Sequence, residues 1–167
     1  MMGAIMSTKE RFEDLLQPLV EVLASMDPND PQAGDKLTDR FPLNSPAMRE
    51  LAEAFAAGVA AGWLCDRQGG LGVTYSRVRK ARPDGAPADA LSVDAVRMDR
   101  PGPGHTHPHG EFDLCFAVEG SPTFDGHPPG WTVYPAGSWH VPSVSGGTMN
   151  ILYFLPHGAI EFGPRPA

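Results

Sequence analysis

The chain has few cysteines, few basic residues and no long apolar run, and each shortage excludes a class of protein. Two cysteines among 167 residues cannot form a framework of disulfide bonds. The net charge of −7 argues against a nucleic-acid partner, because phosphates need a basic surface. No apolar stretch is long enough to span a membrane, and no charged segment followed by an apolar one opens the chain. We therefore expect a cytoplasmic protein with neither a membrane nor a nucleic-acid partner.

The distribution of apolar residues predicts helices first and short strands afterwards. Apolar residues at helical spacing predict a helix over 8–26, which Pro18 should kink or divide. A second helix should begin after Ser45 as N-cap, with Pro46 in its first turn, and run towards Gly62. A further turn is expected over 37–41. After a turn at 66–70, strands are expected over 71–78, 91–98, 112–118, 122–124, 132–134, 140–141 and 149–155.

This order predicts one mainly β protein with a helical start. The 19 glycines and 18 prolines suit the many turns of a sandwich or small barrel, since 41% of the residues are still apolar. We expect a helical region over 1–66 that packs on the barrel or on a dimer partner, and a β-barrel over 67–167. The helical region carries no histidine, so we expect it to contribute nothing to a metal site.

Side chains that bind transition metals are concentrated between residues 105 and 140. Three histidines at period two, two carboxylates and a distant fourth histidine make up the set: His105, His107, His109, Glu111, Asp113 and His140. Alternate residues of a strand share one face, so these side chains should converge if the strand is regular. Imidazole and carboxylate ligands suit Zn, Fe, Mn or Ni and leave positions open for chemistry. The pattern predicts one divalent metal ion.

The same segments resemble the paired motifs of the cupin superfamily, which implies a single cupin-type jelly-roll β-barrel preceded by two or three α-helices. Residues 135–140 fit the second motif, P-x-G-x2-H, although Gly130 lies one residue closer to the proline than in the family pattern, and Val144 stands where the family often has Asn. The first motif, H-x-H-x3-E, fits in two registers. One uses His105, His107 and Glu111 but leaves eight residues before Gly120 where the family has six. The other uses His107, His109 and Asp113 and fits every gap, with Asp in place of Glu.

We favour the first register because glutamate is the family's carboxylate and because Pro108 and Gly110 are natural loop residues between the histidine pair and Glu111. The predicted metal ligands are then His105, His107, Glu111 and His140. Asp113 and His109 would face the same cavity as catalytic or supporting groups.

Longer stretches are similar to the 4-hydroxylaminobenzoate lyase family: 40–48, 61–67, 105–117, 129–135 and 151–156. The resemblance implies conversion of 4-hydroxylaminobenzoate to 3,4-dihydroxybenzoate and ammonia in nitroaromatic breakdown. The carboxylate of such a small aromatic substrate suits an arginine, with Arg97 and Arg77 as candidates. Tyr134 and Trp139 could stack on its ring.

Two other classes of function stay open, and we expect a homodimer in each case. One is a cupin dioxygenase or isomerase that acts on another small aromatic acid, and an oxygenase would consume O2. The other is a sensor that binds a metal or ligand without turnover, and its helices would expose a large apolar patch to a partner.

Overall fold

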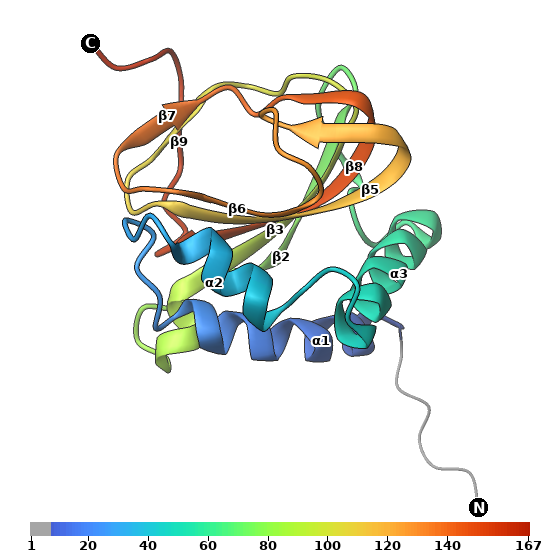
Figure 1. The fold of residues 1–167 in the computed structure, drawn as a ribbon, viewed down its shortest axis with the longest axis horizontal. Coiled ribbons are helices and arrows are strands. Elements are labelled where there is room, and N and C mark those ends of the chain that lie inside the picture. The colour runs from blue at the N-terminus through green and yellow to red at the C-terminus, as the bar shows by residue number, and fades with distance from the viewer. Residues whose placement is uncertain (1–7) are drawn as a thin grey trace, which may run out of the picture.

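The computed structural model describes residues 8–167; residues 1–7, part of the expected helical region, lie outside the described residues. Within this range three α-helices precede a β-barrel (Figure 1). The helices are α1 (Thr8–Leu23), α2 (Ala33–Arg40) and α3 (Pro46–Ala61). The strands, with one 3-10 turn before β3, are β1 (Arg67–Gly70), β2 (Val73–Arg79), η1 (Pro87–Ala90), β3 (Leu91–Met98), β4 (His105–His107), β5 (Glu111–Phe124), β6 (Gly130–Tyr134), β7 (Ser138–His140), β8 (Val144–Pro156) and β9 (Glu161–Phe162).

The helix ends follow the capping signals of the sequence. The Ser45 hydroxyl accepts a hydrogen bond from the Met48 N–H at the start of α3, and Gly62 ends this helix with a φ of 86°. α1 is shorter than expected and ends at Leu23, and Pro18 lies inside it without dividing it. The expected turn over 37–41 is the second half of α2.

The strands form two sheets that close the barrel. The larger sheet has six strands in the order β1-β2-β3-β8-β5-β6, and the smaller has the order β7-β4-β9. Three strand predictions differ from the structure. Residues 67–70 pair with β2 instead of forming a turn, the expected strands 112–118 and 122–124 are one bulged strand, and β9 was not expected. Residues 67–70 form a local hairpin with β2. The continuous β5 and the strand β9 depend instead on pairing with β8 and β4, which are distant in the sequence, and local turn residues do not reveal these pairings.

The two faces of the large sheet bury different partners. Alternate residues such as Ala95, Leu114 and Phe154 pack against apolar residues of the helices, including Phe12 and Leu16. The opposite face points into the barrel, where Val96, Cys115, Ile151 and other side chains form a second apolar cluster. The helices therefore cover the outer face of the sheet and leave its inner face to the site (Figure 1).

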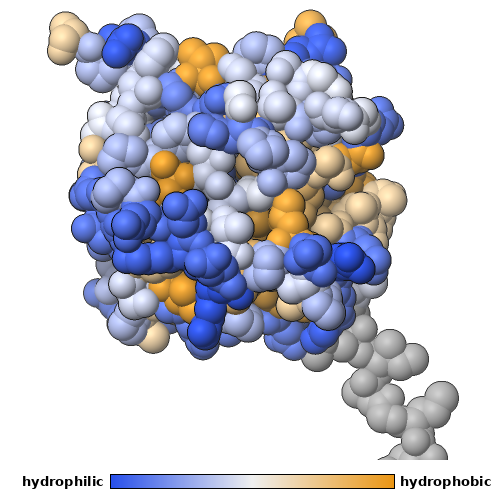
Figure 2. Space-filling view, viewed as in Figure 1, coloured by the Kyte–Doolittle hydropathy of each residue, from blue (hydrophilic) through white to orange (hydrophobic). Residues whose placement is uncertain are grey.

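The helical layer has no broad apolar surface on the side drawn in Figure 2. Apolar side chains on that face form several groups separated by hydrophilic residues. None of the helices within residues 8–167 is long and apolar enough to cross a membrane.

Candidate metal centre

Three strands bring the favoured ligand set together. β4 pairs with β7, so that His105 lies opposite His140, and His107 projects from the same face of β4 two residues later. Residues 108–110 then turn the chain into β5, whose first residue is Glu111. Gly110 has a φ of 87°, and a Cβ at this position would lie 2.6 Å from Pro28 and 2.9 Å from the Tyr134 carbonyl oxygen. Glycine is therefore required to place Glu111 beside the histidines.

The ligand atoms of His105, His107, Glu111 and His140 all lie within 4.8 Å of one another. His140 Nε2 is 3.1 Å from His105 Nε2 and 3.7 Å from Glu111 Oε2. Glu111 Oε2 is 2.9 Å from His107 Nε2, and Glu111 Oε1 is 3.8 Å from His105 Nε2. Two ligands that each lie about 2.0–2.2 Å from one ion, at tetrahedral or octahedral angles, are separated by roughly 2.8–3.6 Å. Two of the four distances lie in this range and two lie slightly above it, so the cluster could hold one small divalent ion.

Hydrogen bonds on the outer side of each imidazole select the metal-binding tautomer. His105 Nδ1 lies 3.2 Å from the Pro103 carbonyl oxygen, which can only accept a hydrogen bond, so Nδ1 carries the proton. His107 Nδ1 lies 2.9 Å from Ser138 Oγ, whose own proton is donated to the Pro135 carbonyl oxygen at 2.6 Å. Each ring therefore turns an unprotonated Nε2 towards the other ligands.

The third histidine is oriented by Asp125, which the sequence reading missed. Asp125 Oδ2 accepts a hydrogen bond from His140 Nδ1 at 2.6 Å and another from the Tyr134 hydroxyl, and Oδ1 accepts one from the Ser143 N–H at 2.8 Å. Asp125 has a φ of 49°, and its neighbour Gly126 has a φ of 82°. In the sequence this Asp-Gly pair is a turn signal, so only the tertiary fold reveals its contact with a ligand.

The charges of the cluster call for a cation at its centre. Three Nε2 lone pairs and a carboxylate face one another; His105, His107 and Glu111 are buried and His140 is partly buried, and neither Glu111 oxygen has a hydrogen-bond partner among the described residues. Such an arrangement is costly unless a metal ion or a proton lies between the groups. The residues therefore fit a metal ion, as the first register predicts.

Two carboxyl groups lie side by side at the start of β5. Burial alone raises the pKa of Glu111, but interactions with His105 and His107 outweigh burial and lower it. Burial and the neighbouring charge of Glu111 raise the pKa of Asp113 well above its usual range. Both Asp113 oxygens are buried without a hydrogen-bond partner among the described residues. Asp113 thus shares the inner face with Glu111, as strand alternation predicts, and its catalytic role stays a prediction.

His109 does not face the cavity, and that expectation is wrong. Its side chain is exposed in the turn between β4 and β5, and its ring packs at 5.0 Å from the ring of His157. Alternation predicts a shared face only within an unbroken strand, and residues 108–110 break it. The second register, which needs His109 as a ligand, is not the one that the structure assembles.

Two of the three predicted substrate-binding residues also lie elsewhere. Arg97 follows Ala95 on the helix-facing side of β3, whereas Asp94, Val96 and Met98 line the cavity inside the barrel. Trp139 lies opposite Thr106, on the outer face of the small sheet, and its indole N–H donates to the Gly163 carbonyl oxygen at 3.0 Å. Neither side chain therefore lines the cavity, because each strand turns it to the other face. A contact of either residue with a substrate stays untested.

Tyr134, the third, supports the ligands. Its ring centroid lies 4.3 Å from that of His140 and 5.2 Å from that of His107, and its hydroxyl donates to Asp125. The ring thus fixes two imidazoles from the side, and contact with a substrate stays a prediction.

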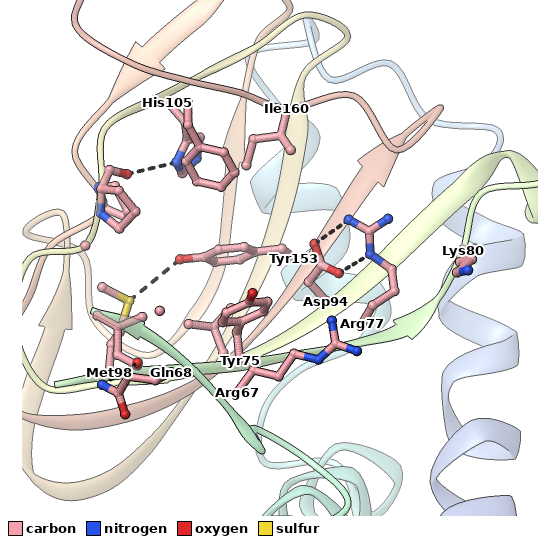
Figure 3. A pocket seen from close by; sticks show the side chains of 17 residues that line it. Arg67, Gln68, Tyr75, Arg77, Lys80, Asp94, Met98, His105, Tyr153 and Ile160 are labelled. Carbon is pink, nitrogen blue, oxygen red and sulfur yellow. Dashed lines mark hydrogen bonds and ion pairs between the residues drawn. The ribbon is translucent and has the colours of Figure 1, made fainter. Parts of the chain in front are cut away.

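A cavity of about 590 Å³ opens beside the cluster, on the inner face of β2, β3 and β8. Of the four clustered residues, His105 lines it, together with Tyr153 and Ile160 (Figure 3). The cavity is large enough for a small aromatic molecule and gives that molecule access to one side of the metal centre.

Known proteins resemble this chain in sequence, and others resemble it in fold. A 4-hydroxylaminobenzoate lyase of Pseudomonas putida is 28% identical over 142 residues, which cover 75% of this chain and 80% of the relative. A 4-hydroxylaminobenzoate lyase of Nocardioides sp. (strain LMS-CY) is 30% identical over 138 residues, which cover 78% of this chain and 80% of the relative.

Among solved structures, one described as DMSP lyases RdDddP and RnDddQII covers 94% of this chain and 98% of that chain, with a TM-score of 0.53 and 14% identity. This likeness concerns the fold alone, and it confirms a mainly β, cupin-type barrel with a helical start. The sequence match is more specific than the structural one. Residues 14–162 match the family described as PnbB, 4-hydroxylaminobenzoate lyase, and the chain belongs to that family.

Proposed function

We propose that the protein is a metal-dependent lyase that converts 4-hydroxylaminobenzoate and water to 3,4-dihydroxybenzoate and ammonia, within nitroaromatic breakdown. The observation that carries the proposal is the family match over residues 14–162, which includes all four residues of the metal cluster. The cavity beside His105 supports it, because the cavity can hold one aromatic ring next to the cluster.

The proposed reaction constrains the chemistry. The N–O bond of the hydroxylamine breaks, a C–O bond forms at the neighbouring ring carbon, and the C–N bond is replaced by a second C–O bond. Water supplies one oxygen, and the atoms balance without an oxidant or a reductant. The reaction should therefore proceed without O2.

The residues of the chain divide this work. His105, His107, Glu111 and His140 would hold a divalent ion, which would act as a Lewis acid towards the hydroxylamine oxygen. Asp113 is the group that we propose for proton transfer, because its carboxyl is buried beside Glu111 and has no other described partner. Asp125 keeps His140 in its ligand form, and the mostly apolar cavity walls would contact the ring of the substrate.

The test is an anaerobic turnover assay. Purified protein with measured metal content is incubated with 4-hydroxylaminobenzoate under nitrogen, and both 3,4-dihydroxybenzoate and ammonia are quantified. A chelator-treated sample and the same sample after metal is restored serve as controls. Formation of both products in equal amounts, lost and regained with the metal, is the expected result.

The alternatives give other outcomes in the same assay. A dioxygenase would turn over a small aromatic acid only in air and with Fe(II), and a sensor would bind 4-hydroxylaminobenzoate without forming product. The donor set of three imidazoles and one carboxylate suits several ions, so metal analysis identifies the one present. The homodimer and the cytoplasmic location stay predictions.

A further inference from the structure

Positively charged side chains lie on the side of the cavity that is away from the metal centre. In Figure 3, His105 is at the top of the view, and Arg67, Arg77 and Lys80 lie below it and to the right. All four residues line the same cavity of about 590 Å³. A molecule inside it would thus meet a metal ligand at one end and positive charge at the other.

Strand register gives the distance from the cationic side of the cavity to Tyr153, a residue of the cavity wall. Arg77 pairs with Asp94, Asp94 with Tyr153, and Tyr153 with Asp113, so the four residues form one row across β2, β3, β8 and β5. Neighbouring strands lie about 4.8 Å apart, which puts the backbone of Arg77 roughly 10 Å from that of Tyr153. A cavity of this width and of about 590 Å³ can hold a single ring.

One of the two arginines already has a partner. Arg77 donates to both oxygens of Asp94, at 2.5 and 3.2 Å. Arg67, by contrast, has no ion pair or side-chain hydrogen bond within residues 8–167. With Arg67, Arg77 and Lys80 against Asp94, the cavity carries an excess of positive charge in a chain whose net charge is −7. This excess favours an anionic ligand.

The wall between the charged side and the metal centre is mostly apolar. It is formed by Val73, Val96, Met98, Pro103, Ile160 and Phe162, together with the rings of Tyr75 and Tyr153. The Tyr153 hydroxyl is directed to the sulfur of Met98, at 3.7 Å. These side chains would bury an aromatic ring and offer few partners to a second polar group on it.

We propose that Arg67 binds the carboxylate of a para-substituted benzoate whose other substituent points towards the metal centre. The guanidinium fork matches a carboxylate in geometry as well as in charge, which the ammonium group of Lys80 does not. The Arg77–Asp94 ion pair lies next to this position and holds the neighbouring wall in place. The inference rests on the proposed function for the identity of the substrate, but its binding test does not depend on turnover.

The test compares an acid with its uncharged amide. Binding of 4-aminobenzoate and 4-aminobenzamide to the metal-loaded protein is measured by calorimetry for the wild type, R67Q and R49Q. Arg49 is an exposed arginine on α3, in the helical layer, and its replacement removes the same charge outside the cavity. We expect R67Q to bind 4-aminobenzoate on the order of 10- to 100-fold more weakly, as for a lost charge-assisted hydrogen bond, and to bind the amide unchanged.

The outcomes separate this inference from the proposed function. R67Q protein that binds the acid as tightly as R49Q, or wild-type protein that does not prefer the acid to the amide, would overturn the role of Arg67. If the acid is held through Arg67 but 4-hydroxylaminobenzoate gives no ammonia, the carboxylate site stands and the proposed reaction fails. If turnover occurs, R67Q should raise KM and leave kcat nearly unchanged, and an unchanged KM would count against Arg67 alone.

Discussion

Replacing Asp125 by Asn should switch His140 to the wrong tautomer without moving the backbone. The Ser143 N–H donates to Asp125 Oδ1, so the amide oxygen of the variant should stay there and its NH2 group should take the place of Oδ2. That NH2 group would face His140 Nδ1, which now lies 2.6 Å from Oδ2. Two N–H donors repel, so the imidazole would carry its proton on Nε2, the atom that faces the other ligands. Asn tolerates the φ of 49° at this position well.

The size of the effect follows from the role of such hydrogen bonds at metal sites. Loss of a group that orients a ligand typically lowers metal affinity 10- to 100-fold, or about 1.4–2.7 kcal/mol. Because a bound ion stabilises the fold in proportion to the logarithm of its affinity, the metal-induced gain in unfolding free energy should fall by the same amount. Two independent measurements should therefore agree.

The affinity is measured by competition with a chromophoric chelator for zinc, and the stability by urea unfolding with and without the ion. D99N is the matched control, since Asp99 is an exposed carboxylate paired with Arg100. The chelator-treated D125N protein should unfold close to the chelator-treated wild type. Wild-type zinc affinity in D125N would refute the reasoning, because His140 would then keep its ligand form without the carboxylate.

Three further predictions test the site and the core. Glu111→Gln should weaken metal binding, whereas Asp113→Asn should keep the metal and lower turnover by about 10²- to 10⁴-fold. Measuring metal stoichiometry and ammonia release for both variants separates these roles. Loss of metal from the Asp113→Asn protein would make Asp113 a ligand. Phe12→Ala removes a fully buried ring that packs edge-on against Phe55, so it should lower the free energy of unfolding, measured with urea, by about 3–5 kcal/mol. A decrease of less than about 1 kcal/mol would contradict this packing. Burial raises the pKa of the Cys65 thiol to about 12, so between pH ~8.5 and 10 the thiol ionises only in the unfolded protein. The unfolding free energy of the wild type should therefore fall over this pH range relative to that of Cys65→Ala. The same dependence of unfolding free energy on pH in both proteins would argue against this.

The parts of the site that were predictable from the sequence are those held by local geometry. His105 and His107 share a face because they belong to one short strand, and Gly137, with a φ of 79°, makes the turn that leads to His140. The helix bounds at Ser45 and Gly62 are local in the same sense, since capping depends on a few neighbouring residues.

Other residues depend on which face of the sheet is covered. On β3 both faces are buried, with Val93 and Ala95 against the helices and Val96 inside the barrel, so hydrophobic pattern alone cannot tell where Arg97 points. His109 was expected to face the cavity, but it lies in a three-residue turn, where side chains no longer alternate between the two faces of a strand. Asp125 was missed because its partners, His140 and Ser143, are brought to it only by the closed barrel.

β5 shows why the helices matter to a metal centre that they do not touch. Its positions alternate between buried carboxylates inside the barrel, Glu111 and Asp113, and large apolar side chains on the helix side, Phe112 and Leu114. Two neighbouring buried carboxyl groups oppose folding of this strand, because neither is fully paired by the described residues. Burial of the apolar side chains under the helical layer favours folding of the strand, because it removes them from water. The helices therefore hold in place a strand that the two carboxyl groups on its inner face would destabilise, and this accounts for a helical layer that supplies none of the four clustered residues.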